Sequence, residues 1–68
     1  MDYIYVLVYD KIEWEDIIIL LSVEEAIKES INHSKSRIEI FSKNDKNKYT
    51  PTYNYYKNGE YIQNSTSE

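Results

Sequence analysis

Large hydrophobic residues fill every position of segment 3–9, where tyrosine or leucine alternates with isoleucine or valine. Successive side chains of a strand point to opposite faces, so both faces of this segment are apolar or amphipathic. Such a strand is typical of the middle of a sheet, covered on one face by a helix and on the other by tyrosine rings or a partner. The β-branched run 17–21 predicts a second strand, and the acidic connection 10–16 between them contains Trp14.

A helix is predicted next, from about Val23 to about His33. Residues 22–25, Ser-Val-Glu-Glu, match a capping box, in which the serine hydroxyl accepts from the Glu25 amide and the glutamate reaches back to the Ser22 amide. The apolar residues of this segment form one stripe at Val23, Ala26, Ile27 and Ile31. We expect this stripe to face the sheet, with the single alanine of the chain allowing close approach.

The second half of the chain predicts three more strands. Segment 37–41 alternates, with Ile38 and Ile40 inward. Segment 49–56 is a strand interrupted near Pro51, which predicts either a sheet edge or a bulge there, because proline cannot donate to a strand ladder.

The pair Asn58-Gly59 is a strong hairpin signal, since a type I′ turn needs positive φ at both central residues. Segment 61–63 is the returning strand. The element order is therefore β-β-α-β-β-β, which predicts an α+β fold with a single helix packed on a small, mostly antiparallel sheet. We expect one compact domain over residues 1–63 and a disordered polar tail over residues 64–68.

Length and charge narrow the possible functions. A chain of 68 residues allows one small domain, and the absence of cysteine excludes disulfides and thiolate metal sites. A net charge of −4 argues against general nucleic-acid binding. Residues 1–34 hold eight carboxylates and two basic side chains, whereas residues 35–68 hold four carboxylates and six basic side chains. The basic half would suit a small anion or an acidic protein, or the two halves attract each other within the fold.

Met1 is not followed by a basic region and a long apolar run, so no signal peptide is expected. The run 17–21 is far too short to span a bilayer. These features predict an intracellular protein without a membrane segment.

A core this small gains from further burial, so both a monomer and a homodimer stay open.

Catalytic and metal-binding patterns are weak. His33, the only histidine, falls at the end of the predicted helix, where a protonated ring favours the helix dipole. The single glycine belongs to the hairpin turn and not to a phosphate loop. We therefore expect a non-enzymatic protein with no cofactor and no metal site.

Tyrosine is the most informative residue type, because five of the eight tyrosines lie within 49–61. Such rings can anchor a protein partner, stack on a nucleobase, or simply pack across the strands. Trp14 is either folded over the sheet edge or exposed as an anchor for a partner. The candidate binding residues are Trp14, Arg37, Tyr49, Tyr53, Tyr55, Lys57 and Tyr61.

Segments 25–28, 37–41 and 49–59 together resemble short uncharacterised proteins encoded by giant DNA viruses. The resemblance implies a viral origin and brings no known activity or site residues. With the tyrosines it leads to the hypothesis of a viral accessory protein that binds a host or viral protein through a tyrosine-rich sheet face. Two alternatives stay open: sequestration of a small nucleotide, such as a defence signal, by a homo-oligomer, and a structural virion component.

Overall fold

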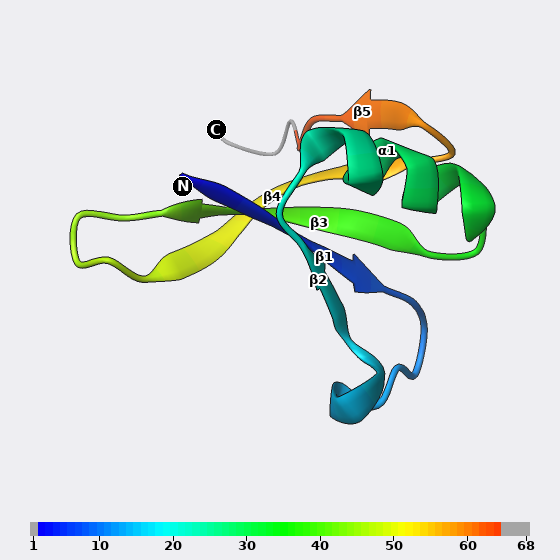
Figure 1. Ribbon diagram of the computed structural model, residues 1–68, viewed down its shortest axis with the longest axis horizontal. Helices are drawn as coiled ribbons and strands as arrows, with labels where there is room; N and C mark the ends of the chain where they lie inside the picture. The colour runs from blue at the N-terminus through cyan, green and yellow to red at the C-terminus, as the bar shows by residue number, and fades with distance from the viewer. Residues whose placement is uncertain (1, 65–68) are drawn as a thin grey trace.

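The computed structural model describes residues 2–64, which form one five-stranded antiparallel sheet with a single α-helix on one face (Figure 1). The elements are β1 (Tyr3–Val8), the 3₁₀ helix η1 (Trp14–Asp16), β2 (Ile18–Leu20), α1 (Val23–Asn32), β3 (Arg37–Lys43), β4 (Tyr49–Lys57) and β5 (Glu60–Ile62). The strand order is β2-β1-β3-β4-β5. The predicted α+β class and element order are confirmed, and η1 is an addition within the predicted acidic connection.

Helix α1 begins at the predicted serine cap, where the Glu25 N–H donates to Ser22 Oγ over 3.4 Å. Its buried positions are Ala26 and Ser30, whereas Val23 is 39% and Ile31 58% exposed, so the predicted stripe is wrong at both ends. At the C-terminal end the reason is a polar contact, because Ser30 Oγ accepts the Gly59 N–H over 2.9 Å and turns this position towards the β4–β5 turn.

The core lies where α1 crosses the middle of the sheet. Leu7 of β1 and Ile38 of β3 are register partners, and both are almost fully buried with Ala26 above them. Alanine at this point of α1 keeps the helix close to the two central strands. Tyr5, Leu20 and Tyr56 surround this cluster and are themselves half-buried.

A bulge in β4 explains how the strand accommodates Pro51. Pairing passes from Glu39–Tyr55 to Phe41–Pro51, so residues 52–54 lie opposite Ile40 alone. The Thr52 hydroxyl donates to the Ile40 carbonyl over 2.8 Å, and Tyr53 has a positive φ of 68°. The predicted bulge is confirmed. Because β5 pairs only with residues 55–57, β4 is interior there and has an open edge at Pro51.

The β4–β5 turn has the predicted type I′ signature, with φ of 53° at Asn58 and 82° at Gly59. The turn also packs against α1. A Cβ on Gly59 would lie 3.1 Å from two carbons of the Ile31 side chain, so glycine is needed for space as well as for backbone conformation.

The predicted tail 64–68 falls outside the described residues except for Asn64, whose N–H donates to Asn54 Oδ1 over 2.9 Å. Neither helix within residues 2–64 is long and apolar enough to cross a membrane.

Candidate functional site

The sheet has two faces, and the tyrosines are divided between them. On the helix side the rings of β1, β4 and β5 line one hollow, namely Tyr3, Tyr5, Tyr56 and Tyr61. Tyr53 and Tyr55 line a second hollow on the opposite, helix-free face. The two extra residues of the bulge preserve the alternation of β4, so Tyr53 and Tyr55 share a face that Tyr56 does not. The candidate tyrosines therefore do not form one continuous surface.

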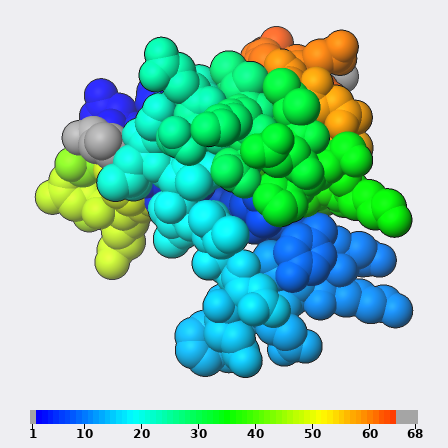
Figure 2. Space-filling view, turned by 45° about the vertical axis from the view of Figure 1, so that its right-hand side comes forward, coloured from blue at the N-terminus to red at the C-terminus, as the bar shows by residue number. Residues whose placement is uncertain are grey.

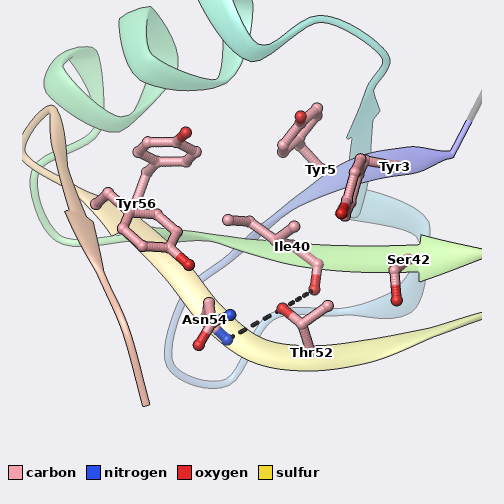
Figure 3. A pocket seen from close by; sticks show the side chains of 8 residues that line it. Tyr3, Tyr5, Ile40, Ser42, Thr52, Asn54 and Tyr56 are labelled. Carbon is pink, nitrogen blue, oxygen red and sulfur yellow. Dashed lines mark hydrogen bonds between the residues drawn. The ribbon is translucent and has the colours of Figure 1, made fainter. Parts of the chain in front are cut away.

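The helix-side hollow measures about 290 Å³ and has a polar floor that includes Thr52 and Asn54 (Figure 3). Its rings also contact one another. The Tyr56 ring centroid lies 6.4 Å from that of Tyr5 and 5.6 Å from that of Tyr61. Burial, and after it the neighbouring Tyr56 and Tyr3, raise the pKa of Tyr5. Tyr5, Tyr56 and Tyr61 thus serve packing, which is the cross-strand role that the sequence left open for them.

On the helix-free face Arg37 lies beside Tyr55, with its guanidinium carbon 5.9 Å from the ring centroid. Arg37 Nε also pairs with the Glu39 carboxylate. Arg37, Tyr53 and Tyr55 line a shallow hollow of about 440 Å³, so the structure brings these three candidates together. The other candidate tyrosine of β4, Tyr49, stands opposite Lys43 at the far end of the strand.

Lys57 lies at the end of β4 and is held by two main-chain acceptors. Its Nζ donates to the Ser34 carbonyl over 2.9 Å and to the Ser36 carbonyl over 3.2 Å. Arg37, Tyr55 and Lys57 line a separate hollow at this end of the sheet. Three of the candidate residues therefore line this third hollow, which has more basic side chains in its lining than the hollow of Tyr53 and Tyr55.

Trp14 lies on η1, lines none of these three hollows and is 80% exposed. The exposed alternative is therefore the one that the structure adopts. Figure 2 shows the chain from the end of β1 to β2, coloured blue to cyan, projecting from the rest of the molecule. Ile17, Ile18, Ile19 and Leu21, which follow Trp14, are also exposed. We call Trp14 together with Ile17–Leu21 the β2 edge segment.

Strand β2 pairs with β1 on one side and, within the described residues, with no strand on the other. The backbone is extended from Ile17, with φ −70° and ψ 132°, to Ser22, with φ −124° and ψ 135°. An unpaired edge presents free N–H and C=O groups to another strand, and proteins usually protect such edges with charged residues. The opposite edge strand, β5, carries Glu60, whereas Ile17–Leu21 carries no charge.

Carboxylates flank the β2 edge segment on both sides. Residues 12–27 contain five acidic side chains and no basic one, and all five are exposed: Glu13, Glu15, Asp16, Glu24 and Glu25. Three precede β2 and two lie in the first turn of α1. The segment is thus an apolar strip with a negative charge at each end.

Within residues 2–64, no group of three His, Cys, Asp or Glu side chains is placed to hold a metal ion. His33 Nε2 lies 3.1 Å from the Glu29 carboxylate one turn earlier on α1, and both side chains are partly exposed. This pair stabilises the end of the helix when the imidazole is protonated.

No protein-family model, curated protein or solved structure matches this chain. The resemblance to proteins of giant DNA viruses stays a prediction.

Sequence reasoning did not single out Ile17–Leu21 as a site. The run of five hydrophobic residues without a charge was visible, but periodicity does not distinguish an edge strand from an interior one. It also missed Tyr9, Lys11 and Lys35, which line the same opening as Lys57 and are brought there only by strand register.

Proposed function

We propose that this protein is a non-enzymatic binding module that captures a partner protein by strand addition at β2. The observation that carries the proposal is the unpaired edge of β2 with its exposed, uncharged hydrophobic side chains. A strand that is hydrophobic on both faces is typical of a sheet interior, and β2 would become interior once another strand paired with it. Trp14 beside it supplies the kind of aromatic anchor that contributes strongly at interfaces.

The charge around β2 defines the partner. Five exposed carboxylates flank the segment, so a matching strand carries hydrophobic residues in its middle and lysine or arginine at its ends. A second copy fits less well. Antiparallel pairing of β2 with itself would place Asp16 of one copy near Glu24 of the other, and these like charges repel.

The partner would be a host or viral protein if the chain is a viral accessory protein, as the resemblance implies. As a binding surface, the tyrosine-rich sheet face is a weaker candidate than β2. Tyr5, Tyr56 and Tyr61 contact one another across the strands, and Tyr55 lies beside Arg37. Truncating them would therefore disturb the fold together with any surface they form.

The proposal can be tested with a display library of random peptides selected on the full chain. We expect enrichment of extended sequences with alternating hydrophobic residues between basic ends. The variant Ile19→Lys places a charge on the exposed edge and should lower the affinity of the selected peptides about tenfold or more. Thr50→Lys adds the same charge at an exposed position of β4 and serves as the control.

Hydrogen exchange on the complex then locates the contact. Strand addition should protect backbone amides within Ile17–Leu21, because these amides gain partners. Protection confined to Tyr53 and Tyr55 would instead assign binding to the helix-free face and contradict the proposal. If the chain forms a dimer that Ile19→Lys abolishes, β2 pairs with a second copy and not with a partner protein, and this result would also contradict the proposal.

A further inference from the structure

Two connections of the chain and the end of β4 meet at one end of the sheet. β1 ends at Val8, which is the register partner of Arg37 at the start of β3, and β4 ends close by at Lys57. Because these strands are antiparallel, the β1–β2 connection and the α1–β3 loop converge there. Together they enclose a hollow of about 550 Å³, which we call the basic hollow. This volume falls within the range of small-molecule sites, about 300–1,000 Å³.

Positive charge is concentrated in the basic hollow. Four of the eight basic side chains line it, although the whole chain has a net charge of −4. They are Lys11, Lys35, Arg37 and Lys57. Asp10 is the one carboxylate among the lining residues. Like charges gathered in this way repel each other, and a bound anion relieves that repulsion.

Two of the four cations are held in place and two are free. Lys57 donates to the Ser34 and Ser36 carbonyls, and Arg37 is paired with Glu39. Within residues 2–64, Lys11 and Lys35 have neither a hydrogen-bond nor an ion-pair partner. The main chain fixes the position of Lys11, which has a φ of 63° in a turn that the Ile12 N–H closes on the Tyr9 carbonyl over 3.2 Å. The hollow thus presents two unpaired ammonium groups beside a guanidinium.

Two aromatic rings complete the hollow, because Tyr9 and Tyr55 also line it. Tyr9 is 40% exposed and is available for stacking, while Tyr55 lies under the Arg37 guanidinium. Rings beside cations fit a ligand that joins a planar base to phosphates, since the base stacks while the phosphates pair with the cations. We propose that the basic hollow binds a small nucleotide carrying two or three phosphates.

This site is separate from β2 and does not depend on strand addition. The test is a titration of the full chain with ATP, inorganic tripolyphosphate and adenosine, followed by amide chemical shifts. We expect saturable binding of ATP with shifts confined to residues 9–11, 35–37 and 55–57, weaker binding of tripolyphosphate, and none of adenosine. No shifts at millimolar ATP, or tripolyphosphate binding as tightly as ATP, would overturn the assignment.

Matched variants test the location without changing the fold. Lys11→Gln and Lys35→Gln each remove an unpaired cation and should lower the affinity for ATP about fivefold. Lys46→Gln removes an exposed lysine of the β3–β4 loop and makes the same change in net charge. Equal weakening by all three would mean that only net charge matters, and this result would contradict a defined site.

A gain in affinity provides the sharpest test. Glu39 competes with phosphate for Arg37, so Glu39→Gln should free the guanidinium and tighten ATP about threefold. Asp45→Asn alters the net charge equally but lies in the β3–β4 loop, away from the lining of the hollow, and it should leave the affinity unchanged. Equal tightening by Asp45→Asn, or selection of single-stranded RNA over ATP, would overturn the proposal of a small-nucleotide site.

Discussion

The β4–β5 hairpin and the β2 edge segment are both rich in large hydrophobic residues, yet their surroundings differ. In the hairpin, Tyr56 contacts the rings of Tyr5 and Tyr61, and the Gly59 turn is tied to Ser30 of α1. In the β2 edge segment, Trp14 and Ile19 are more than half exposed. The tyrosine content predicts a binding surface on the hairpin, but the hairpin rings largely pack within the fold. The exposed hydrophobic side chains are those of β2, such as Ile18 and Ile19.

This difference separates stability from binding along the chain. Substitutions in the hairpin should lower the free energy of unfolding, because they remove contacts with α1 or with neighbouring rings. Substitutions at the exposed positions of the β2 edge segment should affect mainly association, because these side chains have little burial to lose, whereas Leu20 packs against the core cluster.

The largest effect is expected for Tyr56→Ala. The Tyr56 ring packs beside the core cluster of Leu7, Ala26 and Ile38 as well as against Tyr5 and Tyr61. Its removal should lower the free energy of unfolding by about 3 kcal/mol, as measured by urea denaturation. Tyr53→Ala is the comparison on the same strand, since Tyr53 is 64% exposed and should cost far less. Equal losses for the two variants would show that the helix-side rings are not a packing unit.

A smaller effect is expected for Gly59→Ala. An alanine there would keep a positive φ and bring its Cβ to 3.1 Å from Ile31, so we expect a loss of about 1–2 kcal/mol in denaturation. Asn47→Ala also places alanine at a positive φ, 63°, on an exposed loop, and should cost less. In an Ile31→Val background the cost of Gly59→Ala should fall, and an unchanged cost would exclude crowding by α1.

The sequence was sufficient for local features that depend on neighbouring residues. The Ser22 cap and the Asn58-Gly59 turn were predicted and are confirmed, because their chemistry is complete within four residues. The bulge beside Pro51 was one of two predicted alternatives and follows from the missing proline N–H. These signals establish the elements and their order.

Features that depend on packing between distant segments were not predictable. Ile31 fits the hydrophobic stripe, but α1 turns Ser30 towards Gly59, 29 residues further along the chain. No periodicity encodes which edge of the sheet β2 occupies, and none gathers Lys11, Lys35 and Lys57 at one end. For that reason the element order was predicted correctly, whereas the two candidate sites, the β2 edge segment and the basic hollow, are not the tyrosine-rich face that was expected.

A further test on the packed side uses alkaline pH. Burial raises the pKa of Tyr5 above the ordinary value of 10.0, so the unfolded chain loses this proton at lower pH than the folded protein does. The stabilising contribution of Tyr5 is therefore complete below pH 10 and is lost as the pH rises through the folded pKa. We expect the free energy of unfolding to fall in that range and Tyr5→Phe to reduce the slope. A slope that is identical in Tyr5→Phe would contradict the assignment to Tyr5.

The smallest effect on stability is expected for Trp14→Ala. With 80% of its surface exposed, the side chain has little burial to lose, so the free energy of unfolding should change by no more than about 0.5 kcal/mol in urea. The same variant should weaken the peptides selected on β2, because an aromatic anchor beside the strand would be missing. A large loss of stability would show that Trp14 belongs to the packed part of the molecule. Unchanged stability with unchanged binding would restrict the contact to Ile17–Leu21 and leave Trp14 outside it.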